Sequence, residues 1–296
     1  MWPKDRALSP VGDRAMIQQL ALKALAARRF ILKLGFEQKI RLHYGATMSI
    51  VEILTLLYHR WMTIDPSRPS WQERDRFVLS KGHAAPALYA VLSSAGFFPE
   101  SEFDNFRRIG SRLQGHPDRN KTPGVDCSTG SLGQGLPVAC GMALCSKIDE
   151  APYKVYACIG DGECNEGSIW EAALIASNLG LDRLIVLLDR NKKSSYGVMK
   201  GRNDVEPLAD KWRAFNWAVF ECDGHDYVSL SSSLCGAETT RGRPSVILCN
   251  TVKGKGIPLA ENTPVRSNFY LEPERYREAL ESLDKTENEI RHDRQD

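Results

Sequence analysis

The feature that most constrains the fold is a series of short apolar runs that alternate with helix-length segments. Runs with strand character occur at 154–159, 184–189, 217–222 and 245–249. Segments of helical length separate them, at 167–180, about 205–215 and 227–239. This alternation predicts an α/β fold with a doubly wound, mainly parallel sheet and helices on both faces. Continuously apolar runs are typical of strands that are buried on both sides.

The first half of the chain adds further elements. Apolar residues recur at helical spacing over 13–35, which predicts an amphipathic helix, and we expect a second helix over 48–62. Residues 76–80 predict a short strand that a helix follows. From 108 to 135 the chain is rich in Gly, Pro, Ser and Asp and lacks periodicity. So long an irregular stretch inside a compact domain is usually functional or disordered, and its position before a predicted helix at 134–147 favours a functional loop.

Length alone permits one large domain or two ordinary ones, and the pattern along the chain favours a single domain over residues 1–296. The chain has 296 residues, of which 42% are hydrophobic, enough to bury a sizeable core. No internal repeat and no obvious linker divides it. From about residue 265 the sequence becomes charged, which predicts a peripheral helical tail.

Charge and cysteine usage predict a cytoplasmic protein. Lys and Arg number 39 against 37 Asp and Glu, a formal charge of +2, which gives no electrostatic argument for nucleic acid or membrane. No apolar run approaches the length of a transmembrane helix, and the N-terminus lacks the apolar core of a signal peptide. None of the eight cysteines forms a CxxC pair. Buried thiols in a reducing compartment explain them better than disulfides or zinc.

The sharpest motif directly follows a predicted strand and precedes a predicted helix: Gly160-Asp161-Gly162-Glu163. Ligands of open α/β sheets bind at the carboxyl ends of strands, where glycine permits close backbone approach to a phosphate and a helix N-terminus favours an anion. Asp161 would add an oxygen ligand for magnesium or calcium bridging a diphosphate. An ordinary strand-to-helix turn uses the same residues, so this motif alone leaves both interpretations open.

A second polar residue follows the next predicted strand. Asn191 leaves that strand at the same edge of the sheet, so Asp161 and Asn191 can converge on one metal ion. The alternative is that Asn191 caps a turn, as asparagine often does. Two oxygen ligands, each placed after a strand, favour a metal–diphosphate site.

The order of these motifs and of several others resembles the N-terminal portion of transketolase. The GDG motif, the acidic helix start and the later Asn look like the thiamine diphosphate signature. The resemblance covers about residues 15 to 262. The matching blocks are 43–46, 75–83, 115–117, 129–135, 160–167 and 251–256. It implies a thiamine diphosphate-binding fold.

The resemblance also implies the cofactors: thiamine diphosphate and a divalent metal, Mg²⁺ or alternatively Ca²⁺ or Mn²⁺. The implied metal ligands are Asp161, Asn191 and a backbone carbonyl near Lys193. The loop 130–135 matches the segment that supports the two rings of the cofactor, although a plain glycine-rich helix entry would have the same sequence. The implied cofactor contacts are His83, Ser131, Leu132, Gly133, Gly160, Asp161, Gly162, Glu163 and Asn191.

Four residues match the catalytic residues of the family. His43, His83 and His116 would bind substrate hydroxyls, assist proton transfer and touch diphosphate oxygens. Taken singly, each of these histidines would more often be structural. Glu166 resembles the acidic link between paired cofactor sites, and its alternative role is a solvated glutamate at a helix N-terminus. His225 also matches a family block, but we favour a structural turn there.

The sequence departs from the family in two places. It stops before the pyrimidine-binding domain, which carries the glutamate that activates the cofactor. We therefore expect a separate C-terminal transketolase-like partner chain and an α2β2 heterotetramer. In addition, the family usually has a histidine after the segment that corresponds to Pro264, whereas this chain has Val265-Arg266-Ser267-Asn268-Phe269. The loss of an imidazole near Ser267 puts an ordinary sugar phosphate substrate in doubt, and Arg266 is either an anion ligand or an exposed surface residue.

Three hypotheses for the function follow. The first is the N-terminal subunit of a two-component, transketolase-like transferase that moves a two-carbon ketol unit from a ketose or ketose phosphate to an aldehyde. The second is a subunit of a thiamine diphosphate-dependent 2-oxo acid decarboxylase with acyl or ketol transfer. The third is a cofactor-binding regulatory subunit without turnover. All three share the same cofactor site.

Overall fold

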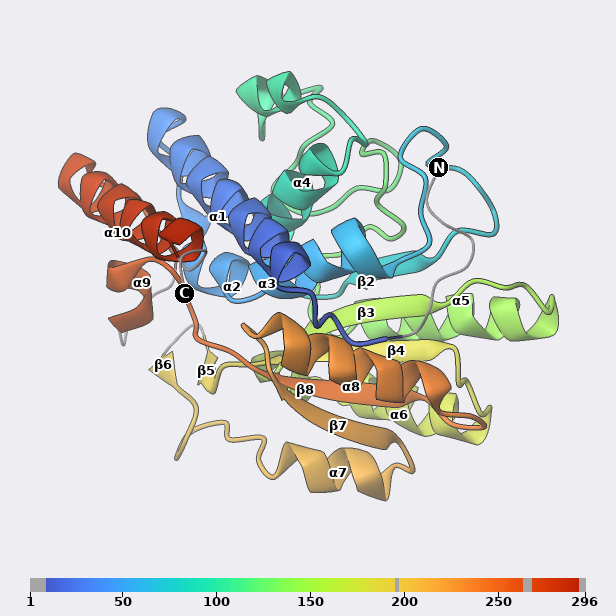
Figure 1. Cartoon of the computed structure of the whole chain (residues 1–296). Helices are drawn as coiled ribbons and strands as arrows, with labels where there is room; N and C mark the ends of the chain where they lie inside the picture. Colours follow the sequence, from blue (N-terminus) through green and yellow to red (C-terminus); the bar gives the residue numbers. More distant parts are fainter. Residues whose placement is uncertain (1–8, 195–196, 263–267, 293–296) are drawn as a thin grey trace.

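A computed structural model describes residues 9–194, 197–262 and 268–292. Its centre is a five-stranded parallel sheet with strand order β2-β3-β4-β8-β7 (Figure 1). The prediction of a parallel α/β fold is therefore confirmed. The strands are β2 (Arg76–Leu79), β3 (Val155–Gly160), β4 (Leu184–Arg190), β7 (Ala218–Asp223) and β8 (Ser245–Asn250).

The central strands are apolar over most of their length because both faces of the sheet are covered. Along β3, Tyr156 and Cys158 belong to one core cluster, whereas Val155, Ala157 and Ile159 belong to another. This alternation is what a strand requires, since successive side chains point to opposite faces. Each helix layer therefore receives every second residue of the strands.

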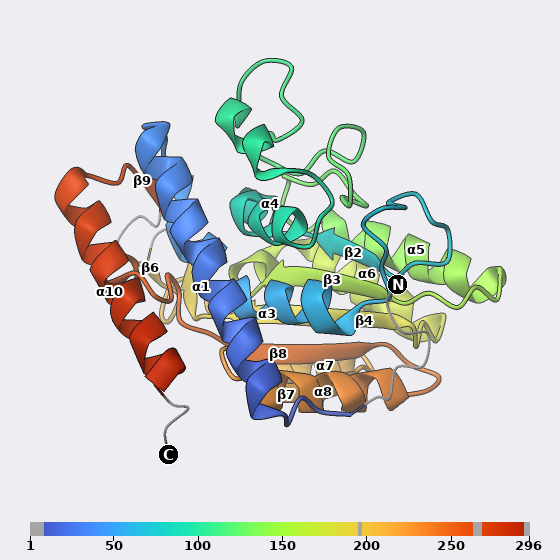
Figure 2. The same cartoon turned by 45° about the horizontal axis from the view of Figure 1, so that its top comes forward.

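Helices cover both faces, as predicted. One face carries α1 (Arg14–Glu37), α3 (Val51–Leu56), α4 (Ala85–Ser94) and α8 (Tyr227–Thr239). The other carries α5 (Gly135–Ile148), α6 (Gly167–Asn178) and α7 (Leu208–Ala214). Figure 2 shows the first layer in front of the sheet and the second behind it. None of the described helices is long and apolar enough to cross a membrane.

The single helix predicted over 48–62 is wrong in detail. The structure has α2 (Tyr44–Met48), then α3 and a π-helical turn (Leu57–Trp61), with a break at Ser49 and Ile50. The Ser49 hydroxyl donates to Asp189 at 2.7 Å instead of facing solvent. The same hydroxyl lies 3.2 Å from the carbonyl of Ala46, and local contacts between a side chain and the backbone compete with regular helix geometry. The break therefore ties the N-terminal helices to the end of β4.

The segment 108–135 is irregular, as predicted. It runs from the short 3₁₀ helix Glu100–Asn105 to α5. A buried ion pair between Arg74 and Asp126 fixes its middle, and the Thr129 hydroxyl donates to the carbonyl of Leu79 at 2.6 Å. The segment is thus held against the carboxyl end of β2.

The C-terminal part packs against the first helix and pairs with a short strand near the N-terminal helices. After α9 (Pro258–Asn262), β9 (Asn268–Phe269) pairs antiparallel with β1 (Leu42–His43). The charged helix α10 (Pro273–His292) lies beside α1 in both views. Its Ala279 and Leu283 are buried, and Gln18 of α1 donates to the carbonyl of Ile290 at 2.7 Å.

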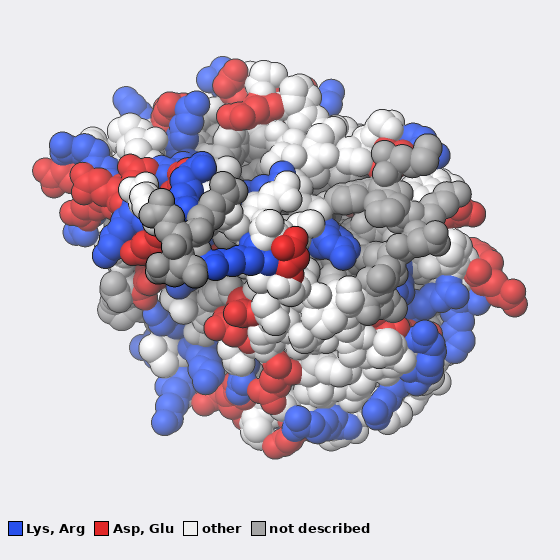
Figure 3. Space-filling model, in the orientation of Figure 1, with Lys and Arg blue, Asp and Glu red and all other residues white. Residues whose placement is uncertain are grey.

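Charged side chains are mixed over the face shown in Figure 3. Basic and acidic side chains adjoin one another towards the rim of this face, and uncharged side chains cover much of its centre. This agrees with the nearly balanced composition of 39 basic and 37 acidic residues.

Candidate active site

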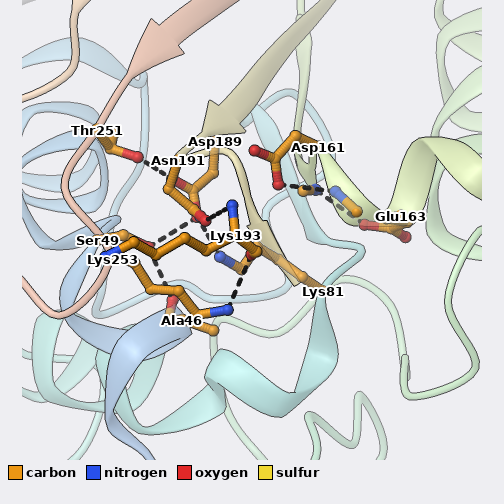
Figure 4. Close-up of polar contacts among 12 residues, drawn as sticks. Ala46, Ser49, Lys81, Asp161, Glu163, Asp189, Asn191, Lys193, Thr251 and Lys253 are labelled. Atoms are coloured by element: carbon orange, nitrogen blue, oxygen red, sulfur yellow. Dashed lines mark hydrogen bonds and ion pairs between the residues drawn. The ribbon is translucent and has the colours of Figure 1, made fainter. Parts of the chain in front are cut away.

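The predicted metal ligands lie at the ends of two neighbouring strands. β3 and β4 are parallel, with Gly160 opposite Asp189, and the amide of Asp161 donates to the carbonyl of Asp189 at 3.1 Å. Asp161 and Asn191 therefore leave the sheet at the same edge (Figure 4). This placement follows directly from the parallel register.

Asp161 is a buried carboxylate that backbone groups hold in place. It accepts hydrogen bonds from the amides of Gly162, at 2.7 Å, and Lys192. Among the described residues no Lys or Arg side chain forms an ion pair with it. Burial and the nearby charge of Asp189 raise the pKa of Asp161 to about 6. A bound cation would stabilise the charged form that burial disfavours.

Asn191 and Lys193 place two further oxygens at this edge. The Asn191 amide nitrogen donates to Asp189 at 3.1 Å, while its oxygen accepts from the amide of Lys193 at 3.1 Å. The Lys193 carbonyl accepts from the ammonium of Lys253 at 2.9 Å. Since carbonyl oxygen has two lone pairs, it can serve a metal as well.

The oxygen set fits a hard divalent cation. The described part of the chain contains no group of three or more His, Cys, Asp or Glu side chains that could hold a metal. A metal here would need the amide oxygen of Asn191 and the Lys193 carbonyl in addition to Asp161. Oxygen donors of this type suit Mg²⁺ and Ca²⁺. Below, these three residues are called the oxygen edge.

Behind the oxygen edge lies a buried ion pair that the sequence interpretation overlooked. Asp189 accepts from the ammonium of Lys81 and also from the hydroxyls of Ser49 and Thr251. Burial disfavours both charges, yet their mutual attraction lowers the pKa of Asp189 and raises that of Lys81. The signal was an Asp at the end of an apolar strand and a Lys directly after another strand. This pair orients Asn191 through its amide nitrogen.

Glu163 connects the GDG turn to the glycine loop. Its buried carboxylate accepts from the Ser80 hydroxyl, from the amide of Gly133 at 2.8 Å and from the amide of Gly160 at 3.0 Å. Protein donors thus already engage the carboxylate that the resemblance placed at the cofactor. The structure gives Glu163 the role of aligning the two loops.

Gly133 cannot be replaced by a residue with a side chain without strain. Its φ is +82°, a left-handed conformation. A Cβ here would lie 2.4 Å from the Ser168 hydroxyl and 2.7 Å from the Cβ of Glu166. The neighbouring Ser131 is exposed and Leu132 is half-buried, so this part of the loop is accessible at the surface.

The three predicted histidines come together from separate segments. The ring centroids of His43 and His83 lie 5.0 Å apart. Burial lowers the pKa of His83 to about 3, and burial together with the nearby His116 lowers that of His43. A Cβ on Gly130 would meet the His116 ring at 3.5 Å, so this histidine lies against the glycine loop. His43, His83 and His116 are called the histidine cluster below.

The remaining candidates lie around these two groups. Glu166 is exposed at the start of α6. Nδ1 of His225 lies 3.0 Å from the Glu52 carboxylate, and Nε2 accepts a hydrogen bond from the amide of Val252 at 2.8 Å. Both ring nitrogens are therefore engaged by other parts of the fold. Val265, Arg266 and Ser267 lie outside the described residues. Asn268, which follows them, contacts His43 at 3.3 Å.

Comparison with known proteins agrees with this geometry. Residues 23–268 match the family described as transketolase, thiamine diphosphate binding domain. The chain is 45% identical over 271 residues to the 6-deoxy-6-sulfo-D-fructose transketolase subunit SqwG of Clostridium sp., covering 90% of this chain and 98% of that protein. It is 43% identical over 246 residues to an apulose-4-phosphate transketolase subunit of Actinobacillus succinogenes, covering 83% and 89% of the two chains.

Solved structures show the same fold. Transketolase from Leishmania mexicana matches with a TM-score of 0.76 at 28% identity, covering 93% of this chain and 46% of that one. Transketolase from Campylobacter jejuni matches with a TM-score of 0.76 at 27% identity, covering 93% and 48%. This chain thus spans about half the length of these structures but nearly the whole of the SqwG relative. The predictions of a transketolase-like transferase and of its N-terminal subunit are confirmed, and the chain belongs to the transketolase family as its thiamine diphosphate-binding part.

Proposed function

We propose that the oxygen edge binds a divalent metal, Mg²⁺ in the first instance, together with the diphosphate of thiamine diphosphate. The observation that carries this proposal is the convergence of Asp161, Asn191 and the Lys193 carbonyl beside the histidine cluster. Asp161 is a buried carboxylate without an ion-pair partner among the described residues. The glycines at 160 and 162 leave room for phosphate, since a Cβ at either position meets no atom closer than 3.7 Å.

The chemistry is transfer of a two-carbon ketol unit from a ketose donor to an aldehyde. Thiamine diphosphate, when bound, would supply a ring that serves as an electron sink for the transferred unit. His43 and His116 would bind hydroxyls of the donor and move protons at its oxygens. His83 stays neutral because burial lowers its pKa to about 3, so it would act as a hydrogen-bonding group near the diphosphate.

We propose that an anionic ketose is the substrate. The two relatives above are named for 6-deoxy-6-sulfo-D-fructose and for apulose-4-phosphate, which both carry an anionic group. Arg107 supports this choice, because its charge helps to lower the pKa values of His43 and His116 and no carboxylate among the described residues pairs with it. Its guanidinium lies against Gly115, next to His116.

A partner chain would complete the site. The relatives are named as subunits, and α5 and α6 expose apolar side chains that a second chain could cover. They are Val138 and Ile148 on α5, and Leu174 and Ile175 on α6, with exposed fractions of 42%, 70%, 51% and 53%. Glu166 is exposed at the start of α6, where a link between paired sites would be accessible. We propose an α2β2 assembly with a C-terminal transketolase-like chain.

We place the protein in the cytoplasm. All eight cysteines, each within the described residues, are free, and six of them are buried. Free buried thiols are typical of proteins in a reducing compartment.

The test is reconstitution with the partner chain, thiamine diphosphate and Mg²⁺. We expect a ketose phosphate or sulfonate donor and an aldehyde acceptor to give a shortened aldose and an extended ketose. Carbon dioxide release from a 2-oxo acid, without ketol transfer, would favour the decarboxylase hypothesis. Cofactor binding without turnover of any donor would favour a regulatory subunit.

A further inference from the structure

The side chain of Asn268, in the C-terminal part of the chain, contacts His43. β1 and β9 pair with His43 opposite Asn268. The amide nitrogen Nδ2 of Asn268 lies 3.3 Å from Nε2 of His43. The two residues are 225 positions apart in the sequence, and the pairing of the two short strands brings them together.

This contact fixes the position of the His43 proton. An amide NH₂ group can only donate, so Nε2 must accept and carry no hydrogen. The single proton of the neutral imidazole then lies on Nδ1. A histidine in this form can donate from Nδ1 to a substrate oxygen, while Nε2 remains held by the amide.

The other end of the same amide has no partner. Oδ1 of Asn268 is buried and accepts no hydrogen bond from the described part of the chain. Buried amide oxygens almost always have a donor, and leaving one without a donor is unfavourable. A hydroxyl group bound beside His43 would supply this donor.

We propose that Asn268 determines substrate specificity in two ways: Nδ2 holds His43 in the Nδ1-protonated form, and Oδ1 accepts a hydrogen bond from a hydroxyl of the ketose donor. An amide oxygen is neutral and an acceptor only, so it selects a hydroxyl and not a phosphate or sulfonate. The identity of the ligand rests on the proposed function, whereas the contact with His43 does not.

The first test reads the tautomer directly in the full chain. ¹⁵N NMR of histidine-labelled protein, with His43 assigned through His43→Gln, should show an unprotonated Nε2 and a protonated Nδ1. Asn268→Ala should mix the two tautomers. Asn268→Asp should move the proton to Nε2, because a carboxylate accepts where the amide donated. A protonated Nε2 in the unsubstituted protein would mean that the amide is turned around, which would overturn the assignment of both ends.

The second test measures specificity in the complex with the partner chain. Losing one hydrogen bond to a donor hydroxyl should lower kcat/KM about tenfold in Asn268→Ala. Asn268→Asp keeps an acceptor oxygen for the hydroxyl but moves the His43 proton away from Nδ1, so its kcat/KM should fall less than that of Asn268→Ala. Asn288→Ala, at an exposed position on α10, is the matched control and should change nothing. Thiamine diphosphate affinity, measured by calorimetry, should be unchanged in all three variants.

The outcomes separate this proposal from the proposed function. If the unsubstituted complex transfers ketol units and Asn268→Ala keeps kcat/KM within about twofold, the hydroxyl contact is wrong. If the unsubstituted complex transfers no ketol unit, the proposed function is wrong, and so is the identification of a ketose as the ligand of Oδ1. The NMR result still decides the contact with His43 in that case.

Discussion

The oxygen edge and the histidine cluster lie in the same site but are held in different ways. Asp161 and Asn191 follow adjacent parallel strands, and their polar atoms are bonded to backbone amides and to Asp189. The histidines come from β1, from the 3₁₀ turn Gly82–Ala84 after β2, and from the irregular segment 108–135, and they meet mainly through packing. A hydrogen-bonded edge is rigid and suits a metal and a diphosphate, whereas a packed cluster of neutral rings suits a substrate whose shape and protons change.

The difference is clearest in the charges. The oxygen edge has the buried Lys81–Asp189 pair behind it, and the Lys253 ammonium binds the carbonyls of Lys193 and Ser194. Burial lowers the pKa of Lys253 to about 8. The histidine cluster carries no such counter-charge among the described residues, and burial keeps its rings neutral. The two regions should therefore respond differently to substitution and to pH.

The largest expected effect is on stability at the oxygen edge. Lys81→Met leaves the Asp189 carboxylate buried without its cation, which should cost about 3–5 kcal/mol of unfolding free energy. It should also weaken thiamine diphosphate binding, because Asp189 orients Asn191. Urea denaturation and calorimetry measure the two effects.

A matched control for this variant is Lys154→Met at the other end of β3. Lys154 pairs with the buried Glu238, which also accepts from Trp61 and Tyr156. This variant should lose stability without losing cofactor affinity. Equal loss of affinity in both variants would show that general destabilisation, and not the orientation of Asn191, is responsible.

The next effect is loss of the metal. Asp161→Ala should lower the affinity for Mn²⁺ by on the order of 100-fold or more, since even residues that only support a ligand contribute 10- to 100-fold. Electron paramagnetic resonance of free Mn²⁺ measures this in the chain with thiamine diphosphate. Asp182→Ala is the control. Asp182 lies before β4, at the opposite end of that strand from Asn191, and accepts a hydrogen bond from the amide of Gly242. An unchanged Mn²⁺ affinity in Asp161→Ala would rule out the oxygen edge as the metal site.

Gly133→Ala should lower the unfolding free energy by an intermediate amount and should affect both regions of the site. The left-handed φ of +82° and the close approach of Ser168 would cost about 1–3 kcal/mol. Because the Gly133 amide binds Glu163, the strain should reach both the GDG turn and the glycine loop. Thermal unfolding checks the stability. The control is Gly141→Ala in α5, where a Cβ meets nothing within 4 Å and should not destabilise the helix.

The smallest effect is a pH dependence from the histidine cluster. The pKa of His83 is lowered from 6.5 to about 3, so the unfolded chain binds a proton that the folded chain does not. The unfolding free energy should therefore fall as the pH falls from about 6.5 towards 3, and this contribution should be constant above 6.5. His83→Asn should reduce the slope of unfolding free energy against pH, and the reduction should correspond to less than about one bound proton.

Denaturation at pH 5 and at pH 7.5 measures this slope. His59, whose pKa burial lowers to about 4 outside the site, gives the comparison variant His59→Asn. It should flatten the slope in the same way but leave substrate kinetics intact. An identical slope in His83→Asn and the unsubstituted chain would show that folding leaves the pKa of His83 unchanged.

The sequence alone determined the parallel sheet and the placement of Asp161 and Asn191 at one edge of it. Continuously apolar runs that alternate with helical segments indicate strands buried on both faces of a parallel sheet. Residues that follow adjacent parallel strands lie at the same edge of that sheet. That is why Asp161 and Asn191 could be paired from their positions in the chain. Local signals of this kind depend only on residues close to each strand.

Only the tertiary structure decided what surrounds these residues. The Lys81–Asp189 pair joins residues 108 positions apart, and the Asn268–His43 contact joins residues 225 positions apart. Such contacts depend on how loops and short strands pack, and no periodicity in the chain encodes them. The carboxylate of Glu163 illustrates this limit: its position in the sequence did not predict the hydrogen bonds that it accepts from Ser80 and Gly133.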